Sequence, residues 1–155
     1  MHNRVLSFLL LFSFVLLSAF SALAQDSEKK VKMKDLPSAV QKTVQEQSQG
    51  AKVRGLAKEV EKGKTSYEVE LFVNGHTKDV LIDPDGKVVA IEEEIALTAV
   101  PAAVKTVIEK QAGKGRISRV ETITKNGTLE YYEAAIKRGG KGREIKVSPE
   151  GQLIK

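Results

Sequence analysis

Apolar residues recur with two different periods along this chain, and the change of period predicts its secondary structure. Spacings of three and four residues predict a helix after Pro37 (Val40, Val44) and another after Pro101 (Val104, Val107, Ile108). After each helix apolar and polar residues alternate, which is typical of strands with one buried face. In the first half this alternation covers 53–60, 67–73, 80–82 and 88–90. Each half is therefore predicted to be one helix followed by about four strands.

The two halves also match at individual positions. Leu36-Pro37 returns as Val100-Pro101 at a spacing of 64, and Asp83-Pro84-Asp85-Gly86 returns as Ser148-Pro149-Glu150-Gly151 at a spacing of 65. Asn-Gly pairs at Asn74-Gly75 and Asn126-Gly127 predict tight antiparallel hairpins. We therefore predict an α+β fold of two tandem repeats, 35–95 and 96–155, with both helices packed on one sheet face. Because a repeat of about 60 residues buries only a marginal core, we expect one continuous sheet.

The beginning of the chain has the pattern of an export signal. Arg4 precedes an apolar run over 5–20, and Ala22-Leu23-Ala24 offers small residues for cleavage, so 1–24 is predicted to be a signal peptide. We expect a periplasmic or extracellular protein with no stable membrane anchor after cleavage. Residues 25–34 contain four Lys, one Glu and one Ser, and this composition predicts a flexible charged lead-in.

Composition excludes several kinds of chemistry. The chain has no Cys, so disulfides, thiolate nucleophiles and sulfur metal sites are excluded. Without 1–24, which hold one Arg and no acid, 24 basic and 20 acidic residues leave a net charge of +4. That charge is modest and aromatic residues are only 5%, which disfavours a nucleic-acid partner.

Candidate catalytic and metal-binding residues are few. His76 is alone in a predicted hairpin turn, and Asp83-Pro84-Asp85-Gly86 lacks the later oxygen ligands of a calcium loop. Glu92-Glu93-Glu94 is expected to be a solvated connector between the repeats, because alternation sends neighbouring carboxylates to opposite faces. The sequence has no Gly-x-Ser-x-Gly elbow, and His76 is the one His after residue 24, so a hydrolase is the least favoured hypothesis. We expect no enzyme activity, cofactor or metal.

The strand 67–71 (Tyr-Glu-Val-Glu-Leu), the Asn-Gly turn and the hairpin Asp83-Pro84-Asp85-Gly86-Lys87-Val88 carry a family resemblance. This order of motifs resembles the PepSY-like domains of secreted bacterial proteins, and both halves share it. Tandem folds of this kind are similar to the beta-lactamase inhibitor protein, whose open sheet side grips an enzyme. The resemblance implies a non-catalytic module that binds, inhibits or modulates another protein, such as a peptidase, without a cofactor.

Two hypotheses about the partner follow. The first is another envelope or secreted protein, contacted by the open sheet face and by the Gly-rich basic hairpin at 137–143. An amphipathic ring of Tyr67 or Tyr132 is suited to such a contact. Adjacent Tyr131 and Tyr132 are predicted to point to opposite faces of their strand. The alternative is an anionic envelope polymer or lipid bound by a Gly-rich basic hairpin, whose four cations are Lys137, Arg138, Lys141 and Arg143.

Overall fold

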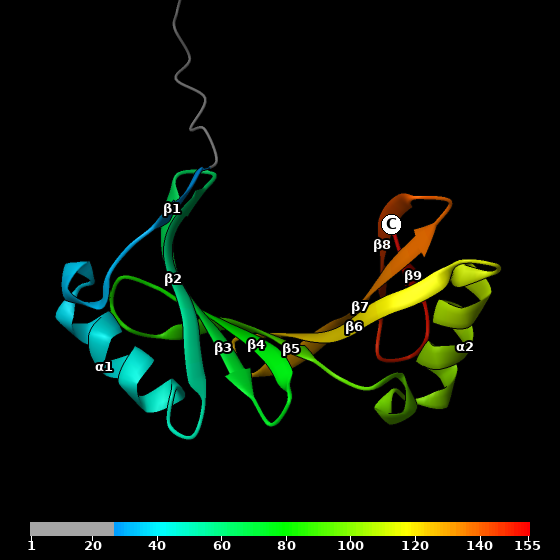
Figure 1. Ribbon diagram of the computed structural model, residues 1–155, viewed down its shortest axis with the longest axis horizontal. Coiled ribbons are helices and arrows are strands. Elements are labelled where there is room, and N and C mark those ends of the chain that lie inside the picture. The colour runs from blue at the N-terminus through cyan, green and yellow to red at the C-terminus, as the bar shows by residue number, and fades with distance from the viewer. Residues whose placement is uncertain (1–26) are drawn as a thin grey trace, which may run out of the picture.

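A single nine-stranded antiparallel sheet carries two helices in the computed structural model, which describes residues 27–155 (Figure 1). The order of strands in the sheet is the order in the sequence, β1 to β9, so every neighbour is joined by a hairpin or a short helical connection. The prediction of one continuous α+β sheet is confirmed. The predicted signal peptide, 1–24, lies outside the described residues.

The same order of elements occurs twice. The first half contains β1 (Ser27–Lys30), the 3₁₀ turn η1 (Met33–Asp35), α1 (Ser38–Gln47), β2 (Lys52–Glu61), β3 (Lys64–Val73), β4 (His76–Ile82) and β5 (Val88–Glu94). The second contains the 3₁₀ turn η2 (Leu97–Ala99), α2 (Ala102–Ala112), β6 (Arg116–Lys125), β7 (Thr128–Arg138), β8 (Lys141–Val147) and β9 (Leu153–Ile154). One helix followed by four strands is therefore observed in each half, and β1 is an addition to the first.

Two predictions about connecting segments are wrong. Within the supposed flexible lead-in, Ser27–Lys30 forms β1, which pairs with β2 through backbone hydrogen bonds that do not depend on apolar side chains. Glu92-Glu93-Glu94 is not a connector, because it ends β5 at the centre of the sheet, where β6 pairs with it. The connection between the halves starts only at Ile95.

Each helix has its own core, and both cores lie on one face of the sheet. Val40 and Val44 of α1 are at most 1% exposed and pack against β3 and β4, while Val104 and Ile108 of α2 are fully buried against β6, β7 and β8. The strand registers place both cores on the same side, as predicted. Val80 of the first core pairs with Ile91, and Glu93, two residues further along β5, lies on the same face and pairs with Thr122. Thr122 in turn pairs with Tyr132 of the second core. Figure 1 shows both helices on the outer side of a curved sheet, whose two ends bend toward the opposite side.

The Asp-x-x-Gly hairpin attaches the sheet to the first helix. Gly86 has φ +87°, and a Cβ there would lie 2.8 Å from the backbone oxygen of Ala39 in α1. Thr43 Oγ1 donates a hydrogen bond of 2.6 Å to the Gly86 carbonyl. The side chain of Asp83 accepts from the backbone N–H groups of Asp85 and Lys87, at 3.0 and 2.9 Å, so its carboxylate shapes the turn.

Candidate functional site

The face of the sheet opposite the helices, here the open face, has no covering layer among residues 27–155. In β3, Val69 and Leu71 contact the first core, so the alternate residues Glu68 and Glu70 point to the open face. The cross-strand registers then place the partners of these residues on the same face across the sheet. Alternation along nine strands therefore gives one broad surface of side chains from both halves.

Carboxylates form a continuous row across this face. Glu70, Asp79 and Glu92 are direct cross-strand neighbours on β3, β4 and β5. Glu121 and Glu133 face each other on β6 and β7. Glu94 of β5 is the direct neighbour of Glu121, so the carboxylate row consists of Glu59, Glu68, Glu70, Asp79, Glu92, Glu94, Glu121 and Glu133. Directly opposed like charges have Cβ atoms about 5 Å apart and destabilise a sheet, so this arrangement works against folding.

The row raises the pKa values of its own carboxyl groups. Burial raises the pKa of Glu68 to about 8, with further contributions from the carboxylates of Glu59 and Asp79. Burial also raises the pKa of Asp79, and the charge of Glu70 adds to this effect. The pKa of Glu92 is raised by burial and then by Glu133. Asp79 and Glu92 therefore ionise at higher pH than exposed acids do, and at pH 7 the Glu68 carboxyl is largely protonated.

Only a few cations oppose this charge. Arg119 Nε lies 3.1 Å from Glu121 Oε1, yet the pKa of Glu121, whose side chain is 8% exposed, is still raised to about 7, chiefly by burial. Lys146 Nζ lies 3.5 Å from Glu133 Oε2, and its pKa is raised mainly by its hydrogen bond with Tyr131. Arg119 lowers the pKa values of Asp79, Glu92 and Glu121, but burial and the neighbouring carboxylates outweigh this effect.

Tyr131 brings an aromatic ring to the open face beside the row. The ammonium groups of Lys146 and Lys125 lie 4.9 and 6.0 Å from its centroid, and Lys146 Nζ donates to its hydroxyl at 3.3 Å. Tyr131 pairs with Ile123, which is 2% exposed and also belongs to the open face. An amphipathic ring held by two cations, next to acidic and apolar side chains, is a mixed surface of the type found in protein interfaces.

The two tyrosines predicted to bind a partner do not lie on this face. Tyr132 is 7% exposed in the core beneath α2, and Tyr67 packs beside the core beneath α1. Tyr131 and Tyr132 do alternate as predicted, but the ring on the open face is that of Tyr131. Tyr132 lies in the core because it is two and four residues along β7 from the buried residues Ala134 and Ile136, and alternate residues of a strand share one face.

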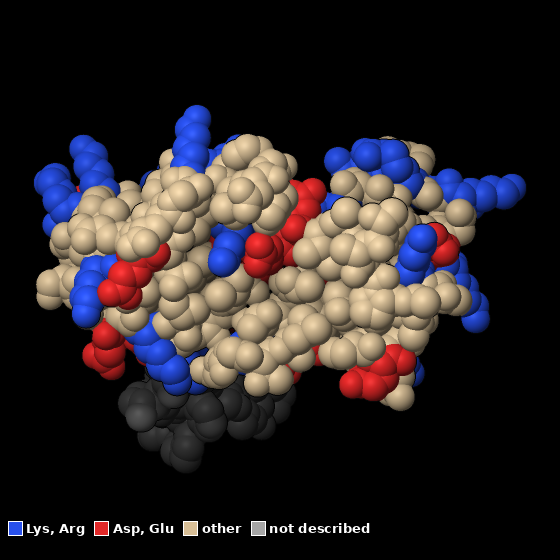
Figure 2. All heavy atoms as spheres, turned by 90° about the horizontal axis from the view of Figure 1, so that it is seen from below, with Lys and Arg blue, Asp and Glu red and all other residues tan. Residues whose placement is uncertain are grey.

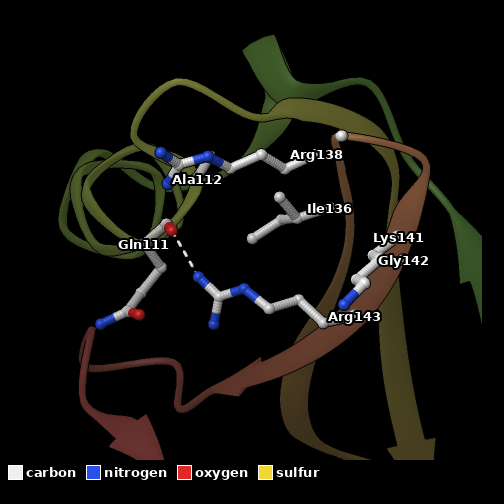
Figure 3. A pocket seen from close by; sticks show the side chains of 8 residues that line it. Gln111, Ala112, Ile136, Arg138, Lys141, Gly142 and Arg143 are labelled. Atoms are coloured by element: carbon white, nitrogen blue, oxygen red, sulfur yellow. Dashed lines mark hydrogen bonds between the residues drawn. The ribbon is translucent and has the colours of Figure 1, made fainter.

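The four predicted cations of the β7–β8 hairpin are all exposed, and three of them line a hollow of about 410 Å³ at the end of α2. Figure 3 shows Arg138 and Arg143 on either side of Ile136, both reaching toward that helix. Arg143 Nη2 donates a hydrogen bond to the Gln111 carbonyl. Lys137 lines a neighbouring hollow of about 270 Å³ instead.

No group of three or more His, Asp or Glu residues suited to a metal ion occurs in the part of the chain that the structure describes. His76 Nε2 lies 3.0 Å from Glu93 Oε1, a pair on the helix side of the sheet.

The carboxylate row was missed by the sequence analysis because its members come from six strands. The available clue was the alternation in 68–70 and 92–94, which places acids two residues apart on one face.

A meandering antiparallel sheet with helices on one face and a bare opposite face defines the class of this α+β protein. The chain belongs to the family described as "Putative beta-lactamase-inhibitor-like, PepSY-like", whose model matches residues 24–90 and 65–155. The predicted resemblance is confirmed. A search of curated proteins found no match.

Several solved structures from Bacteroides share this fold. A "putative periplasmic" protein from Bacteroides eggerthii is 20% identical, with a TM-score of 0.64 over 77% of this chain and 86% of its own. A DUF2874 family protein from Bacteroides ovatus is 18% identical, with a TM-score of 0.61 over 77% and 85%. A BLIP-like protein from Bacteroides fragilis is 18% identical, with a TM-score of 0.57 over 77% and 84%. Within residues 27–155, no helix is long and apolar enough to span a membrane.

Proposed function

We propose that this protein is a non-catalytic binding module of the cell envelope whose open face contacts a partner protein. The observation that carries the proposal is the uncovered face itself, which keeps a row of destabilising carboxylates that a sheet built only for stability would avoid. The family description supports an inhibitory action on the partner, and an enzyme such as a peptidase fits the resemblance of the sequence. The predicted signal peptide supports the envelope location. The two matched segments support an origin as tandem PepSY-like repeats.

The size of the open face suits a stable protein contact. Nine strands about 4.8 Å apart give a width of roughly 38 Å. Strands of seven residues rise about 23 Å. The product is roughly 870 Å², comparable to the ~800 Å² that each partner contributes to a standard interface. A partner can thus be held by this face without any other surface.

The carboxylate row defines the chemistry of the partner, which we propose presents Lys or Arg side chains to it. A partner cation next to Asp79 or Glu92 favours the ionised carboxylate and lowers its pKa in the complex. Binding therefore releases protons, and affinity rises with pH until the free carboxyls are already ionised. For Glu68 that limit lies near its pKa of about 8.

The test is photo-crosslinking in the native envelope from defined positions. A benzophenone amino acid replaces Leu81 or Tyr131 on the open face, and Lys42 or Thr106 on the exposed sides of the helices. We expect one discrete protein to be captured from the two open-face positions only. Capture mainly from the helix positions would contradict the proposal.

A second comparison tests the role of the row. The variant Asp79→Asn/Glu92→Gln is expected to reduce capture from position 131 at least about tenfold, because partner cations lose their counterions. Its control, Glu46→Gln/Glu109→Gln, removes the same charge from two helix residues in exposed ion pairs. Equal capture by all three proteins would remove the carboxylate row from the binding site.

A further inference from the structure

The fold gathers the excess positive charge of the chain at one end. Two segments, 110–116 and 137–143, contain seven cations and no acid. This cluster, the basic tip, consists of Lys110, Lys114, Arg116, Lys137, Arg138, Lys141 and Arg143. The rest of the sequence holds 18 basic and 20 acidic residues, so the net charge of +5 arises entirely from the basic tip. Figure 2 shows Lys and Arg spheres at the right end, where α2 lies in Figure 1, as well as at the left end.

Tertiary contacts join the two segments. Arg116 at the start of β6 pairs with Lys137 at the end of β7. The turn after α2 packs so closely on β7 that a Cβ on Gly115 would lie 2.9 Å from the Ile136 side chain. Arg143 of β8 bonds the Gln111 carbonyl of α2. Cations about 25 residues apart in the sequence are thereby held on one surface.

These cations lack acidic partners. All seven residues are exposed, and none of them forms a salt bridge with another described residue. Such a cluster of uncompensated charge costs free energy through mutual repulsion, and an anion relieves it. The carbonyl end of α2 carries about half a negative charge, which is small against seven cations, and the Arg143 guanidinium already binds it.

The hollow in the basic tip has the form of an anion site. Arg138 and Arg143 flank its floor, formed by Ile136 and Ala112, which are 2% and 6% exposed (Figure 3). The hydrogen bond to the Gln111 carbonyl orients the Arg143 guanidinium group before any ligand binds. Gly139 and Gly142 border the hollow without side chains that would obstruct it. Paired guanidinium groups match the oxygens of a phosphate better than a lysine does.

We propose that the basic tip is a second binding site, for a phosphate group, with Arg138 and Arg143 holding it in the hollow. The phosphate can come from free phosphate or from the headgroup of an anionic phospholipid. The lipid source fits better, because the other cations spread around the hollow can contact neighbouring headgroups and Ile136 offers an apolar floor. This site is separate from the open face, so either proposal can fail without the other.

The experiment measures binding of residues 25–155 to vesicles of phosphatidylcholine with and without phosphatidylglycerol, and to inorganic phosphate by NMR titration. Each cation near an anionic surface contributes about fivefold to affinity, so Arg138→Gln/Arg143→Gln should weaken binding to the anionic vesicles about 25-fold. The control, Lys52→Gln/Lys64→Gln, removes the same charge from exposed residues of the first half and should change binding about twofold or less. Thermal unfolding verifies that both variants fold.

The outcomes separate the sources and the mechanism. Binding to anionic vesicles that falls steeply with salt, with weak shifts from inorganic phosphate at Gly139 and Gly140, assigns the lipid headgroup. Saturable shifts from inorganic phosphate without vesicle binding assign free phosphate. The proposal is overturned if neither ligand binds, or if both double variants lose binding equally, since binding would then follow net charge alone.

Discussion

Replacing Glu68 by Gln should stabilise this protein, although the change removes a charge from a folded surface. In the native protein the pKa of Glu68 is about 8, against 4.5 for an ordinary Glu, because burial and the neighbouring carboxylates disfavour its ionised form. Its contribution to stability is fully present below about pH 4.5 and is lost as pH rises through about 8. The unfolded chain is thus favoured increasingly over this window.

The magnitude follows from the shift. At pH 7 the unfolded pKa lies 2.5 units below the pH, which sets a ceiling of about 3.4 kcal/mol at about 1.36 kcal/mol per unit. Glu68 is only half-buried, so solvent screening reduces this to roughly 1–2 kcal/mol. Gln keeps the shape of the side chain without the cost of charge, so the Glu68→Gln variant should gain about that amount at pH 7 and little at pH 4.5.

Urea unfolding of residues 25–155, followed by circular dichroism at pH 4.5, 7 and 8, measures this difference. The control is Glu130→Gln, an exposed acid of β7 outside the carboxylate row, expected to change stability by less than about 0.5 kcal/mol. A Glu68→Gln variant that is less stable than the wild type at pH 7, or a gain that does not grow with pH, would refute the electrostatic account of the row.

Three further predictions concern the fold. Gly86→Ala should lower the free energy of unfolding by about 2 kcal/mol or more. Gly75→Ala, where φ is similarly positive but the space around the residue is open, should lower it by only about 1 kcal/mol. The difference between the two variants in thermal unfolding measures the cost of the close contact between Gly86 and α1. Arg119→Gln should raise the pKa of Glu121 further above about 7, which a carboxyl NMR titration detects, and an unchanged pKa would mean that their contact is not electrostatic. Residues 25–95 alone should unfold at lower urea than 25–155, because the free edge of β5 loses β6; equal midpoints would show independent halves.

Local patterns predicted the elements of this fold well, because each pattern reflects short-range physics. The alternation of apolar residues identified the strands, and Asn74-Gly75 and Asn126-Gly127 form tight turns, in which all four residues have positive φ. The repeat of Leu36-Pro37 as Val100-Pro101 correctly predicted two helices with one order of strands. The short edge strand β1 is held by backbone hydrogen bonds and has no alternation of apolar residues, so it was not predicted.

The sequence alone established the composition, the repeated order of elements, the family resemblance and the basic hairpin. The carboxylate row depends on how six strands are paired in register, and the basic tip depends on the turn after α2 packing against β7. Both arise from residues far apart in the chain, and charge interactions depend on distance in space rather than separation in sequence. The choice between Tyr131 and Tyr132 likewise required the tertiary structure, because alternation shows that neighbours face opposite ways but not which face the helices cover.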